Sequence, residues 1–147
     1  MRIFTIGYEA ATQEQVIFAL RKAGVKVLAD VRAVPLSRRA GFSKNVLAAG
    51  LKEAGIEYVG LKALGTPPEG REAARKGNMP RLAEVYAAQL ETLEAGVQAA
   101  QLSEMVKERA TALLCFERDP ATCHRSLLID ELFPDAERID LFAGDAC

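Results

Sequence analysis

The chain has 147 residues, of which 50% are hydrophobic and 27% charged, with 19 Lys+Arg against 20 Asp+Glu. This composition is typical of one globular domain, and a chain of this length buries a core that needs neither disulfides nor metal ions. No stretch longer than nine residues lacks Asp, Glu, Lys and Arg, which excludes a membrane-spanning helix. The cysteine count is three, an odd number that fits a reducing compartment. We therefore expect a single cytoplasmic domain over residues 1–147 that has no contact with membranes.

Charge is distributed unevenly along the chain. Residues 21–44 contain seven basic side chains and one acidic one, whereas residues 127–147 carry a net charge of −5. Most charge runs are solvated faces, although a polyanionic partner is an alternative. With a net charge of −1, the whole protein is not a non-specific nucleic-acid binder. Any recognition of an anion therefore has to be local.

The first third of the chain alternates between strands and helices. Residues 2–6 are β-branched and aromatic and predict a first strand. Thr12 and Gln15 have the spacing of a capping box and predict a helix after them. Residues 25–31 predict a second strand, and Ser43 is placed to cap the helix that follows.

The middle of the chain contains a segment rich in glycine and proline. Residues 56–59 predict a short strand, and residues 60–80 predict a long loop of the kind that is functional or mobile. Helical spacing then covers residues 82–105, with a break near Thr92 or Gly96.

The last third predicts a buried strand at residues 110–116, a helix at 126–133 and an edge strand at 139–141. Strands separated by helices imply a mostly parallel sheet covered on both faces. We therefore expect the α/β class, with a single three-layer domain whose mostly parallel sheet is flanked by helices. Ligands bind such sheets outside the carboxyl ends of the strands.

A chemically dense segment follows the predicted strand at 110–116. Signatures of P-loops, dinucleotide-binding folds, zincins, serine esterases and thioredoxins are absent from the chain, and what remains is residues 117–125, Glu-Arg-Asp-Pro-Ala-Thr-Cys-His-Arg. If Thr122 or Asp119 caps the next helix, Cys123 lies near its first turn, where free N–H groups favour a thiolate or a bound phosphate. In the plainer interpretation Cys123 is a buried packing residue and Arg125 forms an ion pair.

Metal binding is a weaker hypothesis for the same segment. Cys115, Cys123 and His124 are too few ligands at a non-standard spacing, and Cys147 lies at the end of the chain. We therefore expect no metal and no cofactor.

A second candidate site follows the second predicted strand. The side chains of Asp30 and Arg32 share one side of the chain if the strand continues, so a salt bridge is the plain interpretation. The functional interpretation makes Arg32 a clamp for an anion. Ser37, Arg38 and Arg39 add hydrogen-bond donors in a loop that could close over a ligand.

Short motifs spread over nearly the whole chain form an ordered series that ends in Cys-His-Arg. They are Thr5-Ile6-Gly7-Tyr8, Asp30-Val31-Arg32 with Pro35 and Ser37, Phe42, Gly55-Ile56 with Tyr58, Leu64-Gly65, Tyr86, Leu114-Cys115 with Glu117, and Cys123-His124-Arg125-Ser126. This series resembles the family called domain of unknown function 488. The resemblance implies a small bacterial or archaeal α/β protein and leaves its reaction open. Members often have a histidine after the first glycine, where this chain has Tyr8.

Two classes of function remain. The first is an enzyme that acts on an anionic substrate, either phosphorylated, a nucleotide or a nucleic acid. Its general acid or base would be Asp30 or Glu117, and in a covalent variant Cys123 would be the nucleophile with His124 as its base. The anion would be bound by a set of polar side chains, namely Tyr8, Arg32, Ser37, Arg38 and Arg125.

The second class is a non-catalytic module that binds nucleic acid or another polyanion through residues 21–44 and the loop to Pro80. Few aromatic residues are available to stack on bases, which disfavours sequence-specific binding of single strands. The sheet edge near the C-terminus leaves a homodimer as an open alternative.

The enzyme hypothesis makes three structural and chemical predictions. A carboxylate, Asp30 or Glu117, is expected to pair with an arginine of the site. Cys123 is expected to be the thiol most sensitive to alkylation at neutral pH. Five side chains are expected to share one cleft: Asp30, Arg32, Glu117, Cys123 and Arg125.

Overall fold

The computed structural model describes residues 1–144 and contains one parallel five-stranded sheet in the order β3-β2-β4-β1-β5. The strands are β1 (Arg2–Gly7), β2 (Val27–Asp30), β3 (Glu57–Gly60), β4 (Thr111–Cys115) and β5 (Glu137–Phe142). The helices are α1 (Gln13–Lys22), α2 (Lys44–Glu53), α3 (Pro68–Arg75), α4 (Met79–Leu90), α5 (Leu93–Glu108) and α6 (His124–Leu132). Short 3-10 helices are η1 (Lys62–Leu64) and η2 (Pro120–Thr122). The predicted α/β class with a parallel sheet is confirmed.

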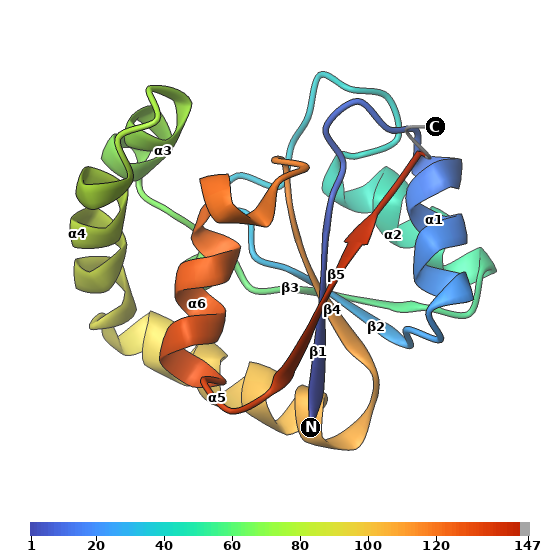
Figure 1. Ribbon diagram of the computed structural model, residues 1–147. Coiled ribbons are helices and arrows are strands. Elements are labelled where there is room, and N and C mark those ends of the chain that lie inside the picture. Colours follow the sequence, from blue (N-terminus) through green and yellow to red (C-terminus); the bar gives the residue numbers. More distant parts are fainter. Residues whose placement is uncertain (145–147) are drawn as a thin grey trace.

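Helices cover both faces of the sheet (Figure 1). Helices α1 and α2 lie on one face, and α4, α5 and α6 lie on the other, with α3 packed against α4. None of the helices in residues 1–144 is both long and apolar enough to cross a membrane.

Strand pleating explains the two separate cores. On β1, Phe4 and Ile6 face α1 and α2, where they pack with residues such as Leu20. The neighbouring Ile3 points to the opposite face and packs with residues of α5 and α6, among them Leu128. The central strand β4 is buried along its whole length, as expected for a parallel strand covered on both faces.

Helix caps confirm some sequence predictions and correct one. The Thr12 capping box forms with Gln15, and Thr92 caps α5 at the predicted break between two helices. Ser43 is the residue before α2, but its hydroxyl makes no cap hydrogen bond. It instead accepts from the backbone N–H of Ser37 at 3.1 Å and donates to the Ser37 carbonyl at 3.2 Å, which fixes the preceding loop.

The prediction of a long loop over residues 60–80 was wrong. This segment contains η1, the whole of α3 and the start of α4. Pro68 occupies the first position of α3, where its missing N–H costs nothing, and Gly77 follows the helix with a φ of 72°. The glycines and prolines therefore mark helix ends rather than one continuous loop.

The strand order creates a crevice at the carboxyl ends of β1, β2 and β4. The chain leaves β1 and β2 towards helices on one face, and it leaves β4 towards α6 on the other face. Where neighbouring strands connect to opposite faces, the connections separate and leave room for a ligand.

Candidate functional site

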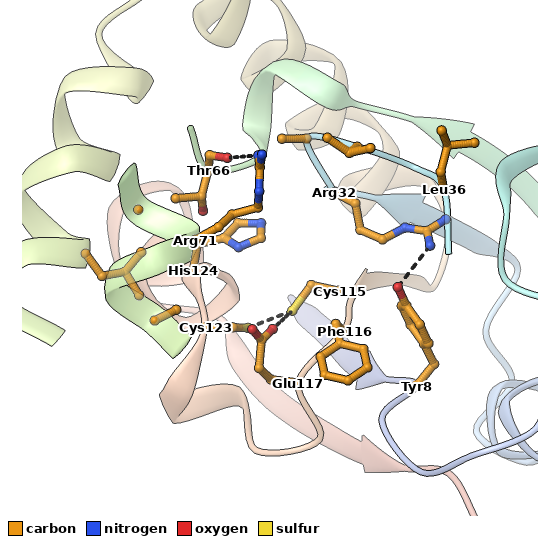
Figure 2. A pocket seen from close by; sticks show the side chains of 15 residues that line it. Tyr8, Arg32, Leu36, Thr66, Arg71, Cys115, Phe116, Glu117, Cys123 and His124 are labelled. Carbon is orange, nitrogen blue, oxygen red and sulfur yellow. Dashed lines mark hydrogen bonds between the residues drawn. The ribbon is translucent and has the colours of Figure 1, made fainter. Parts of the chain in front are cut away.

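A cavity of about 260 Å³ opens at this crevice, outside the carboxyl ends of β1, β2 and β4. Figure 2 shows side chains from several separate segments of the chain around it. Its polar lining consists of Tyr8, Arg32, Thr66, Arg71, Cys115, Glu117, Cys123 and His124. Its apolar lining includes Val34, Leu36, Leu82 and Phe116.

Two glycines allow the segments around the cavity to approach one another. A Cβ atom on Gly7 would lie 1.8 Å from the carbonyl oxygen of Glu117, so β1 could not pass the segment after β4 with any larger residue. A Cβ atom on Gly65 would lie 2.2 Å from the backbone nitrogen of Ala33. The end of β1 is therefore in close backbone contact with the segment after β4, and the segment after β3 with the segment after β2.

Asp30 and Arg32 form a buried, bidentate ion pair. The Asp30 carboxylate accepts from Arg32 Nε at 2.8 Å and from Nη2 at 2.7 Å, and the side chains are 1% and 6% exposed. The hydroxyl of Tyr58 donates to the same carboxylate at 2.5 Å. Burial, and to a smaller extent this hydrogen bond, raise the pKa of Tyr58 above its usual range. The expected pairing of a carboxylate with an arginine is present here.

The contacts of Arg32 leave it few donors for a ligand. Its Nη1 donates to the Phe42 carbonyl at 2.7 Å and to the Tyr8 hydroxyl at 3.2 Å. Burial would lower the pKa of Arg32, but the hydrogen bonds and charge of Asp30 raise it overall. The guanidinium lies at the cavity wall, and its contacts favour the plain interpretation of a salt bridge.

Tyr8 packs as an aromatic support for this pair. Its ring stacks on Phe42 with centroids 4.5 Å apart and meets Phe116 edge to face at 5.3 Å. Tyr8 therefore contributes a hydrogen-bond acceptor to Arg32 and an apolar ring to the cavity wall.

Two thiols meet at the base of the cavity. Cys115 ends β4 and Cys123 precedes α6, and their Sγ atoms are 2.7 Å apart, both in buried side chains. Neither Thr122 nor Asp119 caps α6, because Cys123 is itself the N-cap and its Sγ accepts from the backbone N–H of Arg125 at 3.4 Å. Asp119 caps η2 instead. The sulfur is thus a direct part of the helix terminus.

Arg125 supplies positive charge to Cys123. It is the largest fully buried side chain within residues 1–144, and its Nε donates to Cys123 Sγ at 3.0 Å. Its Nη2 donates to the carbonyl of Glu117, not to a carboxylate. Arg125 is absent from the cavity lining and lies behind the sulfur, so it is placed to stabilise a thiolate rather than to touch a ligand.

The environment separates the pKa values of the two thiols. Burial alone would raise the pKa of Cys123, but the hydrogen bond from Cys115 and the charge of Arg125 hold it below its usual value. Burial and the hydrogen bond with Cys123 raise the pKa of Cys115 well above its usual value. Of the two thiols, Cys123 is therefore the one that loses its proton first as the pH rises.

His124 is not positioned to act as a base for Cys123. Its Nε2 lies 2.7 Å from the Val31 carbonyl, which can only accept, so this nitrogen carries the proton. The ring also meets Tyr86 edge to face at 5.2 Å. These contacts hold the imidazole against the end of β2.

The imidazole of His124, the only one in the chain, is expected to stay neutral down to about pH 4, because burial lowers its pKa from 6.5 to about 4. Between these pH values the unfolded chain binds more protons than the folded one. Stability therefore falls as the pH drops from 6.5 to 4, by about 3 kcal/mol from this group. The single imidazole resonance measures the pKa by NMR, and His124→Gln is expected to remove this share of the pH dependence. A midpoint near 6.5 in the folded protein would contradict the prediction.

Glu117 is half-buried and lies beside the thiols. Its Oε2 is 3.5 Å from Cys115 Sγ, within reach of the S–H group. The single proton of Cys115 therefore has two acceptors, the Cys123 sulfur and the Glu117 carboxylate. This is the arrangement that a general acid or base requires.

The cavity also contains the residues best placed to hold a metal ion. Cys115, Cys123 and a ring nitrogen of His124 lie within 4.8 Å of one another. Three such ligands suit a soft metal ion, but the guanidinium of Arg125 at 3.0 Å from Cys123 Sγ opposes a second cation there. The charge of the site fits a thiolate better than a metal centre.

Several residues proposed from the sequence lie away from the cavity. Arg38 is exposed, and Arg39 donates through Nε to the Ala11 carbonyl at 2.7 Å. Ser37 accepts from the backbone of Arg39 and is tied to Ser43, so its hydroxyl has a structural use. Of the three arginines that were expected to bind the anion, Arg32, Arg38 and Arg125, only Arg32 lines the cavity. Cys147 lies outside the described residues.

Two lining residues were not anticipated from the sequence. Arg71 on α3 donates through Nη1 to the Thr66 carbonyl at 2.8 Å, and this is the only hydrogen bond of its side chain within residues 1–144. The hydroxyl of Thr66 is buried and has no partner among the described residues, although buried polar groups are normally satisfied. One feature of the sequence could have pointed to Arg71, namely the basic residues that lie between the glycines and prolines of residues 60–80.

The fold and cavity define an α/β protein with a two-thiol pocket at the carboxyl edge of a parallel sheet. A family model described as Domain of unknown function DUF488 matches residues 12–132. The chain therefore belongs to this family, as the ordered series of motifs indicated. No curated protein and no solved structure gives a significant match.

Proposed function

We propose that the protein is an enzyme in which the Cys123 thiolate attacks a small anionic substrate bound in the cavity. The observation that carries this proposal is the 3.0 Å hydrogen bond from Arg125 Nε to Cys123 Sγ, formed on a sulfur that lines the cavity. A guanidinium behind a sulfur at a helix N-terminus is the environment in which cysteines become reactive. Glu117 is the acid or base, since it lies beside the thiols and borders the same space.

The anionic group of the substrate is assigned to Arg71 and Thr66. Arg71 keeps most of its donors free of contacts within residues 1–144, and the Thr66 hydroxyl supplies one more donor. The neighbouring Asp30–Arg32 pair is neutral as a unit and serves as a support for the wall. His124, held against Val31, positions the start of α6.

A module that binds polyanions through residues 21–44 receives less support. Arg32 is buried and paired, and Arg39 is tied to the backbone of Ala11. Two of the seven basic residues of this segment are therefore engaged within the fold.

The proposal is tested by comparing iodoacetate with the neutral reagent iodoacetamide at pH 7. In a Cys147→Ser background, Cys123 is expected to be the modified residue and Cys115 to be shielded. Because Arg71 attracts the carboxylate of iodoacetate, Arg71→Gln is expected to lower the iodoacetate rate several-fold and leave the iodoacetamide rate unchanged. Mass mapping of the adducts locates the modified thiol.

Arg75→Gln is the matched control, because Arg75 lies one turn further along α3, is exposed and does not line the cavity. It is expected to change neither rate. Equal effects of the two variants, or a Cys123 that reacts only above about pH 8.5 as an ordinary thiol does, would contradict the proposal.

A further inference from the structure

The relation between the two thiols suggests a specific reaction. Cys115 and Cys123 are separated by seven residues, yet β4 and the N-terminus of α6 bring their sulfurs to 2.7 Å. A disulfide bond has a length of about 2.05 Å, so only a small movement separates the two thiols from a covalent link. Both cysteines are free thiols here. The spacing differs from the Cys-x-x-Cys motif, which explains why the sequence gives no sign of the pair.

We propose that Cys115 is the resolving thiol for Cys123 and that the protein reduces small anionic organic disulfides. This inference rests on the proposed nucleophilic role of Cys123 and adds the substrate class and the second thiol. Because the pKa of Cys123 is lower than that of Cys115, Cys123 attacks first as the thiolate. Cys115 stays protonated during this first step.

The chemistry balances in two exchanges. In the first, Cys123 S⁻ attacks one sulfur of the substrate disulfide, a mixed disulfide forms, and the other half leaves as a thiolate. Glu117 then takes the proton of Cys115, whose new thiolate attacks Cys123 Sγ. The Cys115–Cys123 disulfide forms and the second half of the substrate leaves as a thiolate. Two electrons pass from the protein to the substrate, and an external dithiol returns the protein to its starting state.

The geometry supports each step. The S–H group of Cys115 already has Glu117 Oε2 at 3.5 Å, so its proton can move to the carboxylate when Cys123 is no longer an acceptor. Arg125 Nε remains beside Cys123 Sγ, where it stabilises the sulfur as the leaving group on re-reduction.

The mouth of the cavity fits an organic anion. Val34, Leu36 and Phe116 line it with large exposed side chains, of which Leu36 is 68% exposed. Arg71 lines the same cavity and lies beside Thr66 and His124 (Figure 2). A molecule that combines an apolar body with a carboxylate matches both features.

The experiment uses dithiobis-nitrobenzoate, an aromatic disulfide with a carboxylate on each half and a coloured thiolate product. The full chain in a Cys147→Ser background is expected to release two equivalents of coloured thiolate and to lose two hydrogen atoms in mass. Peptide mapping is expected to show Cys115 joined to Cys123, and dithiothreitol is expected to reverse the link.

Cys115→Ser is expected to release one equivalent and to keep a stable adduct on Cys123. Glu117→Gln is expected to slow the second release several-fold relative to the first. Circular dichroism checks that both variants are folded.

The other outcomes separate the two proposals. A stable adduct on Cys123 in the protein with both thiols would overturn the role of Cys115 and leave the nucleophile standing. Adducts on both thiols would likewise reject the resolving step. No reaction of Cys123 in the folded protein would end both proposals.

Discussion

Replacement of Asp30 by Ala is expected to lower the free energy of unfolding by about 3–5 kcal/mol, because Arg32 would then be a buried charge without its partner. Asp30 holds Arg32 through two side-chain bonds of 2.8 and 2.7 Å, and it also accepts from the Arg32 backbone N–H at 3.1 Å. Tyr58 would lose its acceptor as well. Urea denaturation measures the change through the midpoint, provided that the slope stays constant.

The matched control removes both charges. In Asp30→Leu with Arg32→Met, no buried charge is left unpaired, so the double variant is expected to be much more stable than Asp30→Ala alone. Asp30→Asn keeps the shape but not the charge and is expected to lie between the two. A loss of less than about 1 kcal/mol in Asp30→Ala would show that water reaches Arg32, and the pair would then have the small effect of a surface salt bridge.

Local patterns predicted most of the fold because the sequence satisfies helix and strand rules with short-range contacts. The Thr12 capping box depends only on Gln15, and the break at Thr92 depends on its hydroxyl, which accepts from the backbone N–H of Ala95 three residues further on. The prediction for residues 60–80 was wrong for the opposite reason. Their glycines and prolines are equally suited to loops and to helix ends, and the packing of α3 on α4 decides between the two.

The site was predicted in part, because strand ends are visible in a sequence whereas side-chain directions are not. Arg32, Glu117 and Cys123 follow strands and line the cavity. Arg38 occupies the same loop as Arg32 but points to solvent, and Arg71 comes from a helix that the pattern did not predict. The pairing of Cys115 with Cys123 depends on the turn between β4 and α6, which no local rule specifies.

Arg125 is expected to control the reactivity of Cys123. Replacement by Gln keeps a polar group of moderate size but removes the charge beside the sulfur, while the burial that raises the pKa of Cys123 remains. The pKa of Cys123 should therefore rise, and its alkylation rate at pH 7 should fall several-fold. Alkylation with iodoacetamide across a pH series measures both quantities, and the ultraviolet absorbance of the thiolate gives the pKa independently.

Arg125→Lys provides the control for charge without the guanidinium. Lysine keeps a positive charge near the sulfur but replaces the planar guanidinium, which donates through Nε to Cys123 Sγ and through Nη2 to the Glu117 carbonyl, by a single nitrogen. The pKa of Cys123 in Arg125→Lys should lie between its values in the parent protein and in Arg125→Gln. If the Gln variant stays folded and the pKa of Cys123 does not change, then Cys115 and the helix N-terminus alone determine the thiolate. Arg125 would in that case serve only to join the start of α6 to the segment after β4.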